Sequence, residues 1–233
     1  MPEPATASPA ALVESITSAL RNAGDPTRAE QERRYLKSDR TFAGCSVPAC
    51  RRIVRAATKQ HSPLTHDELI ATVDLLWNGP FFETRRAAVE IAVTHARLLT
   101  HHDLPWLHDL ITHGETWAIV DELAARVLGS IFDHDPTNTA PVLATWATDP
   151  AFWVRRSVLL AHLLGLRSGN GDWPSFTHYA ETMLDEKEFF IRKAIGWVLR
   201  ETSKKRPELV RDWVTPRLDR MSGVTRREAT RYL

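Results

Sequence analysis

The chain has 233 residues, of which 43% are hydrophobic and 25% charged, and its formal net charge is +1. This composition is ordinary for a soluble globular protein. No apolar run approaches the length needed to cross a bilayer, which excludes a membrane-spanning protein. The net charge by itself does not indicate a polyanionic partner. Two cysteines, Cys45 and Cys50, do not form a metal-ligand pattern and favour a reducing compartment, so we expect a cytoplasmic protein.

The N-terminal residues 1–10 are rich in proline and alanine and lack a basic flank followed by an apolar stretch, so we expect a flexible tail. Residues 11–233 are expected to form a single domain. Residues 12–40 predict one or two helices, with Leu12, Ile16 and Leu20 on one face. Four later segments carry apolar residues at helical spacing, and strand-like alternation is nearly absent. These segments are 85–99, 121–132, 155–166 and 187–204.

Pairs of basic residues recur along the chain at a nearly constant interval. The second member of each pair falls at Arg86, Arg156, Lys193 and Arg227, and the first interval is twice 35 residues. An aromatic residue precedes the pairs on the same period, at Phe82, Trp117, Phe152 and Phe189. Extrapolation upstream adds Arg51, followed by Arg52. A period of 34 to 37 residues containing two helices is typical of an α-solenoid. Prolines near the expected helix junctions support this division, at Pro80, Pro105, Pro136, Pro150, Pro174 and Pro207.

One position in the series is an exception. The missing copy should lie near residue 121, where the chain has Asp121 in place of a cation. A carboxylate in a row of cations breaks an otherwise regular pattern, and such breaks often mark functional sites. We call the six positions 51, 86, 121, 156, 193 and 227 the slot positions.

The basic slot positions have two interpretations. If they begin the second helix of each pair, their side chains form a stripe that lines the concave face of a curved superhelix as a basic groove. Arginine accounts for 24 of the 30 basic residues and suits phosphate recognition, because its planar fork donates two hydrogen bonds. The alternative is that the cations form internal ion pairs or cover helix ends. Cations in phase favour a surface for a polyanion.

Two tryptophans share the face of the stripe. Trp197 and Arg200 follow Lys193 by four and seven residues, and those offsets return a helix to nearly the same face. Trp117 precedes Asp121 by four and shares its face if the helix extends back that far. The ordinary fate of a lone indole is core packing. An unpaired carboxylate with two indoles beside it makes a functional role the better explanation.

Several stretches resemble the DNA alkylation repair glycosylases of the AlkD family, which are built from HEAT-like helical repeats. The most specific is Phe189-Phe190-Ile191-Arg192-Lys193-Ala194-Ile195-Gly196-Trp197-Val198-Leu199-Arg200. Others are Trp153-Val154-Arg155-Arg156, Thr116-Trp117-Ala118-Ile119-Val120-Asp121 and a looser stretch from Tyr35 to Arg52. The chain departs from the family pattern at Thr116 and Ala118, and it has Asp39-Arg40 where an aromatic residue is common.

The resemblance implies an all-α solenoid of about six HEAT-like repeats that hydrolyses the N-glycosidic bond of cationic N3- and N7-alkylated purines. It implies that Asp121 is catalytic, that Trp117 and Trp197 flank the lesion nucleotide, and that the enzyme acts without flipping the base into a pocket. It also implies that Arg156 and Arg200 contact the DNA backbone, with a further contact at Tyr35. The stripe adds Lys193, Arg86, Arg51 and Arg52 as backbone contacts.

The expected partner is therefore double-stranded DNA with alkylated bases, bound by a monomer without a metal or cofactor and outside membranes. One carboxylate suffices for this chemistry, because an alkylated purine that already carries positive charge leaves as a neutral molecule. The chain has no insertion large enough to supply a base pocket of its own. Two alternatives stay open, a non-catalytic DNA-binding solenoid and a protein-interaction scaffold.

Overall fold

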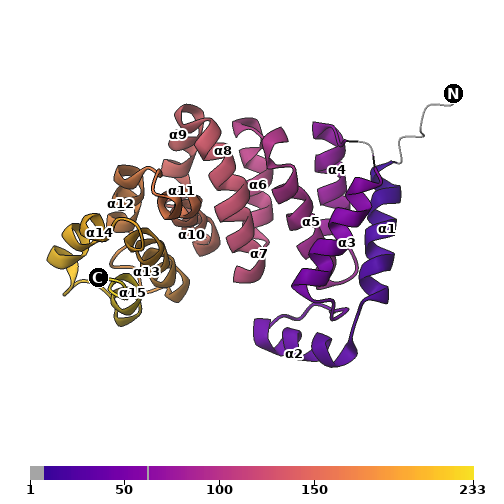
Figure 1. Cartoon of the computed structure of the whole chain (residues 1–233), viewed down its shortest axis with the longest axis horizontal. Helices are drawn as coiled ribbons and strands as arrows, with labels where there is room; N and C mark the ends of the chain where they lie inside the picture. The colour runs from indigo at the N-terminus through magenta and orange to yellow at the C-terminus, as the bar shows by residue number, and fades with distance from the viewer. Residues whose placement is uncertain (1–7, 62) are drawn as a thin grey trace. The chain divides into compact units, whose positions relative to one another are not determined.

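A computed structural model describes residues 8–61 and 63–233, and all regular secondary structure in this part of the chain is helical (Figure 1). The predicted tail falls mostly on residues 1–7, outside the described ranges. Helix α1 already begins at Pro9, after Ser8 as its N-cap. No described helix combines the length and apolarity required to span a membrane.

The chain divides into two compact units, and the first comprises residues up to Leu99 together with Glu115–Ile119. Leu12, Ile16 and Leu20 are fully buried in this unit, as predicted. Stacking follows the pattern of a helical repeat, since α1 packs against α4 while α3 packs against α5. The helices of the first unit are α1 (Pro9–Asn22), α2 (Pro26–Leu36), α3 (Val47–Lys59), α4 (His66–Trp77), α5 (Phe82–Thr94) and the short 3₁₀ helix η1 (Ala96–Leu98).

The second unit comprises Thr100–Gly114 and Val120–Leu233. Here α10 packs against both the π-helical turn η3 and α13, and α13 packs against α15. Its helices are η2 (His101–Asp103), α6 (Leu104–Thr112), η3 (Leu123–Leu128), α8 (Gly129–His134), α9 (Pro136–Trp146), α10 (Phe152–Ala161), α11 (Leu163–Ser168), α12 (Trp173–Thr182), α13 (Phe189–Ser203), α14 (Pro207–Val214), η4 (Thr215–Arg217) and α15 (Gly223–Ala229). Helix α7 (Trp117–Glu122) crosses the boundary between the two units.

The predicted period matches the helix boundaries. Each slot position is the fifth residue of a helix, in α3, α5, α7, α10, α13 and α15. The recurring aromatics Phe82, Trp117, Phe152 and Phe189 are each the first residue of such a helix. Another helix precedes each of the six in the chain, namely α1, α4, α6, α9, α12 and α14, with α2 inserted between α1 and α3. The prediction of an all-helical repeat solenoid is confirmed.

Local sequence explains where the helices start. Proline occupies the first turn of α6, α9, α12 and α14, where its missing N–H costs no helical hydrogen bond. Thr65 and Glu68 form a reciprocal capping box on α4. Before α3, the fully buried Glu83 carboxylate accepts backbone N–H bonds from Ala43, Gly44 and Cys45 at 2.7–3.0 Å. This carboxylate fixes the loop that leads into α3.

Candidate active site and nucleic-acid interface

Asp121 lies near the end of α7, immediately before a helical irregularity. Helix α7 begins at Trp117 and includes Asp121, as the argument that the two residues share a helical face required. The next turn, η3, is π-helical, and the N–H of Gly129 donates to the carbonyl of Ala124 five residues earlier. Such turns are rare and frequently occur at functional sites. The repeat with the exceptional carboxylate is therefore also exceptional in its backbone.

The carboxylate of Asp121 is paired, which corrects the expectation of an unpaired group. Arg156 donates from Nε to Oδ1 at 2.7 Å and from Nη2 to Oδ2 at 2.9 Å. The Arg156 side chain is 3% exposed and that of Asp121 is 14% exposed. The Asp121 side chain is thus partly open to solvent, while that of its partner is not.

Burial and the guanidinium have opposite effects on the Asp121 carboxyl. Burial raises its pKa above the ordinary value, because removal from water disfavours the charged form. The hydrogen bonds and the positive charge of Arg156 oppose that rise. Arg156 is thus the group that favours the ionised form of Asp121.

Arg156 does not lie on an open surface, where we expected it to contact DNA. Its Nη1 donates to the carbonyl of Phe190, and its guanidinium lies 5.7 Å from the centre of the Phe190 ring. All three guanidinium nitrogens are therefore engaged within the second unit. A direct phosphate contact would require this pair to open.

The other predicted cations of the second unit share one acidic partner. Lys193 Nζ lies 2.5 Å from Oε1 of Glu228 in α15, and Arg200 Nη1 donates to the other oxygen of the same carboxylate. Arg200 Nε also lies 3.3 Å from Glu201. The arginine at the last slot position, Arg227, is exposed on α15.

Internal pairing extends to the first unit. Arg51 pairs with Glu90 at 3.2 Å, and Arg86 lies 3.4 Å from Glu32. Arg52 is exposed on α3. The predicted row of cations is present, but much of its charge is compensated by carboxylates from neighbouring helices. The ion-pair alternative raised by the sequence therefore describes most of the slot positions.

Tyr35 and Trp117 form an exposed aromatic pair in the first unit. Their ring centroids lie 6.0 Å apart in an edge-to-face arrangement, and the residues are 72% and 37% exposed. The preceding Glu115 has a φ of 62°, an unusual value for a residue other than glycine. Its carboxylate accepts two hydrogen bonds from Arg40 and one from Arg85. This ion cluster holds the chain where α7 begins.

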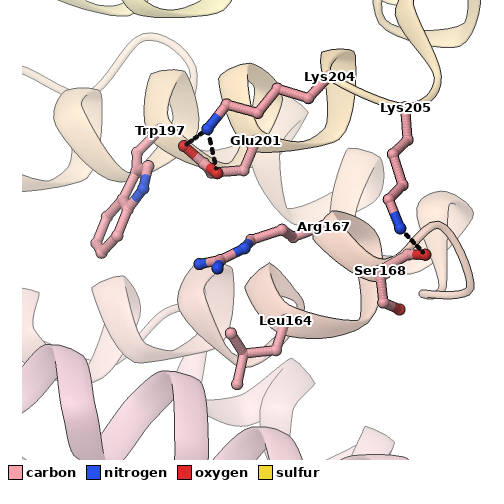
Figure 2. Close-up of a pocket in the computed structure, with 7 residues that line it drawn as sticks. All are labelled: Leu164, Arg167, Ser168, Trp197, Glu201, Lys204 and Lys205. Carbon is pink, nitrogen blue, oxygen red and sulfur yellow. Dashed lines mark hydrogen bonds and ion pairs between the residues drawn. The ribbon is translucent and has the colours of Figure 1, made fainter.

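Trp197 is half-buried on α13 and lines a pocket of about 650 Å³ (Figure 2). This pocket was not predicted from the sequence. The pocket arises between α11 and α13 and needs no insertion. Its volume is within the range of small-molecule binding sites, roughly 300–1,000 Å³.

Sequence reasoning missed the acidic partners, although the repeat period contained the signal. Arg156 follows Asp121 by 35 residues, and Glu228 follows Lys193 by 35 residues. One period along the chain is one step along the stack, so residues at or next to equivalent positions of consecutive repeats become neighbours, and Glu228 lies one residue past the slot position 227. Charge reversal at that spacing predicts an ion pair. Glu115 and Arg40 carried no comparable signal, because their contact depends on loop geometry.

The fold and these ion pairs define a helical-repeat protein in which one repeat carries a carboxylate at a position otherwise held by cations. A family model described as DNA alkylation repair enzyme matches residues 16–233, and the chain belongs to this family. No curated protein matches the chain.

Two solved structures are similar in fold. One is described as a predicted DNA alkylation repair enzyme from Enterococcus faecalis, with a TM-score of 0.78 and 22% identity over 90% of this chain and 96% of that one. The other is AlkD2 from Streptococcus mutans, with a TM-score of 0.60 and 14% identity over 88% of this chain and 99% of that one. At these identities the likeness shows the fold alone.

Proposed function

We propose that this protein is a monofunctional DNA glycosylase of base excision repair that removes cationic N3- and N7-alkylated purines. The observation that carries the proposal is Asp121, a residue whose side chain is partly open to solvent in a chain of the DNA alkylation repair family. Double-stranded DNA is the partner, and a cytoplasmic monomer is the working form.

The chemistry requires one negative charge beside the sugar. When the bond between C1′ and the base nitrogen breaks, its electron pair neutralises the alkylated base, and positive charge develops on the deoxyribose ring. The exposed edge of the Asp121 carboxylate stabilises that charge and orients a water molecule. Water then adds to C1′ and loses a proton. No general acid is required, because the leaving base is neutral.

Arg156 supports this role from behind the carboxylate. Its two donors fix the orientation of Asp121, and its charge opposes the effect of burial on the Asp121 pKa. The lone pairs not used by Arg156 are available to the sugar. In this proposal Arg156 is a positioning residue, while Trp117 and Trp197 supply aromatic faces that attract a cationic nucleotide.

The ion pair also favours a second candidate function. The pair between Asp121 and Arg156 joins consecutive repeats, and so does the pair between Lys193 and Glu228. Both pairs are consistent with a purely structural role. In that case the protein would be a non-catalytic DNA-binding solenoid, and Asp121 would contribute to stability alone.

The two candidates are separated by measuring the bases released from methylated duplex DNA by chromatography. We expect 7-methylguanine and 3-methyladenine from the parent protein, and a loss of at least about 100-fold in Asp121→Asn, the scale of one electrostatic contribution in an active site. Duplex binding by this variant is the control for folding, because Asn preserves the shape of Asp but leaves the buried Arg156 without its counter-charge.

The matched control is Glu122→Gln, which removes the adjacent carboxylate, an exposed group paired with Arg126. This variant should release bases at the parental rate. Equal release by parent and Asp121→Asn would refute the assignment of Asp121 as the catalytic residue. The non-catalytic function would be supported if the parent released neither base.

A further inference from the structure

The pocket beside Trp197 is rich in positive charge. Figure 2 shows Arg167 extending from α11 across the pocket, with Trp197, Glu201 and Lys204 on the opposite wall. Leu164, Ser168 and Lys205 complete the lining. The pocket thus contains three cations, one carboxylate and one indole.

The single carboxylate of the pocket, Glu201, already pairs with neighbouring cations. Glu201 is 7% exposed and accepts two hydrogen bonds from Lys204 Nζ, at 2.8 and 2.7 Å. It also accepts from Arg200 Nε at 3.3 Å. Because two cations share this one carboxylate, it offsets only part of the positive charge in and around the pocket.

Lys205 and Arg167 are the cations of the pocket that no carboxylate neutralises in the described structure. Lys205 Nζ donates to the backbone carbonyl of Ser168 at 3.0 Å, which ties the end of α13 to the turn after α11. Arg167 is exposed and makes no hydrogen bond or ion pair within the described residues. Its fork of donors lies in the pocket, available to an anion.

A nucleotide has the chemistry that this pocket complements. The indole offers a flat apolar face for a sugar or base, and an arginine fork pairs with two phosphate oxygens. An anion here displaces no internal partner of Arg167. In contrast, a phosphate that bound Lys193, Arg200 or Arg156 would have to compete with a carboxylate.

We propose that this pocket binds a phosphodiester of the DNA strand next to the nucleotide that Trp197 contacts, with Arg167 as its principal ligand and Lys205 as a second cation. The proposal rests on the DNA-glycosylase function for the identity of the strand. The proposal places a phosphate contact on α11, a helix that lies outside the predicted cation stripe.

The test uses a DNA duplex with a central abasic-site analogue, which binds without being cleaved. Arg167→Gln should weaken binding by about tenfold near 0.1 M salt, the scale of one charge-assisted hydrogen bond. The slope of log affinity against log salt should fall in magnitude by about one, as expected for one lost phosphate contact. Arg167→Lys should restore most of the slope and only part of the affinity, because it keeps the charge but loses the fork.

A second measurement locates the phosphate. Neutralising single phosphates as methylphosphonates should reveal one position near the abasic analogue at which the parent loses affinity and Arg167→Gln does not. The matched control is Arg97→Gln in the first unit, since Arg97 is also exposed. At each methylphosphonate position, Arg97→Gln should lose the same affinity as the parent does.

The proposal is overturned if Arg167→Gln and Arg97→Gln have the same affinity and salt slope, or if every methylphosphonate affects parent and Arg167→Gln equally. Neither readout depends on catalysis. If the parent releases no base but the Arg167 coupling is present, the glycosylase function fails and the phosphate site stands. If the parent releases base but parent and Arg167→Gln respond equally to every methylphosphonate, the phosphate site fails and the glycosylase function stands.

Discussion

At the level of single residues, the pair between Asp121 and Arg156 links charge, burial and chemistry. The bidentate geometry holds both carboxylate oxygens, and the 14% exposed side chain of Asp121 leaves a route to solvent. Breaking a buried pair by removing one partner is strongly destabilising, about 3–5 kcal/mol. Conservative replacements of Arg156 are therefore the informative ones.

The pKa of Asp121 gives a prediction about pH. If base release requires the ionised carboxylate, the rate should fall as pH drops through the Asp121 pKa, which burial raises above the ordinary value. Replacing Arg156 by Gln removes the group that opposes this rise, so the acidic limb of the pH–rate profile should move to higher pH. Arg156→Lys, which keeps the charge, should move it less. Single-turnover base release from pH 5 to 8 measures both.

Stability is the control for this prediction, and unfolding curves at each pH show whether the variants are folded. Parent and Arg156→Gln profiles that superimpose on the acidic side would contradict the role of Arg156 in the ionisation of Asp121. A uniform loss of rate with no shift would mean that Arg156 only orients the carboxylate.

At the level of helices, the period of the chain sets the ion pairs as well as the core. Glu228 on α15 binds both Lys193 and Arg200 of α13, and Gly196 lets α15 approach closely, since an added Cβ would lie 2.7 Å from the Glu228 side chain. The carboxylate therefore restrains two cations that the sequence assigned to DNA.

Removal of this restraint should strengthen DNA binding. Glu228→Gln leaves Lys193 and Arg200 without their acidic partner, so we expect tighter binding to undamaged duplex by several-fold and a steeper salt dependence. The contact between α13 and α15 should weaken by more than an exposed ion pair contributes, because the Glu228 and Arg200 side chains are only 16% and 20% exposed. Fluorescence anisotropy with labelled duplex measures the affinity.

The matched control is Glu208→Gln in α14, where the carboxylate pairs, among the described residues, with the exposed Arg211 of its own helix. Both variants lose one negative charge, so a general effect of net charge would appear equally in both. Unchanged or weaker binding by Glu228→Gln would show that these two cations do not reach DNA.

Much of the fold was predictable because the period is local information. Recurring aromatics mark helix starts, and the basic pairs fall a fixed distance later, so the six second helices could be located from spacing alone. The same spacing singled out Asp121. The offset from Lys193 drew attention to Trp197, which is half-buried on α13.

Other features of the site depend on contacts that a periodic pattern does not encode. The left-handed Glu115 and its bonds to Arg40 and Arg85 join segments far apart in the chain. The pocket at Arg167 depends on how the side chains of α11 meet those of α13, a contact that the period does not specify. The π-helical turn after Asp121 was not predicted from the spacing of the apolar residues.

At the level of the whole molecule, a buried histidine in the second unit links stability to pH. His162 is 2% exposed, and its ring packs against Phe132 and Tyr179. Its Nδ1 lies 2.8 Å from the carbonyl of Val158, and Nε2 lies 3.2 Å from the Ser175 hydroxyl. A neutral ring satisfies both contacts, with Nδ1 donating and Nε2 accepting.

Burial lowers the pKa of His162 to about 4 from an ordinary value of 6.5. The unfolded chain takes up this proton below about pH 6.5, whereas the folded chain does so only near pH 4. The free energy of unfolding should therefore fall as pH drops through that window, by at most about 3 kcal/mol from this residue, and stay constant above it.

His162→Gln lowers stability at every pH but removes this particular dependence. Urea unfolding at pH 7, 6, 5 and 4.5 measures the difference in the free energy of unfolding between parent and variant. The contributions of the other titrating groups cancel in this difference because both proteins contain them. That difference should shrink steadily toward low pH, and a difference that stays constant would place the acid sensitivity of the protein elsewhere.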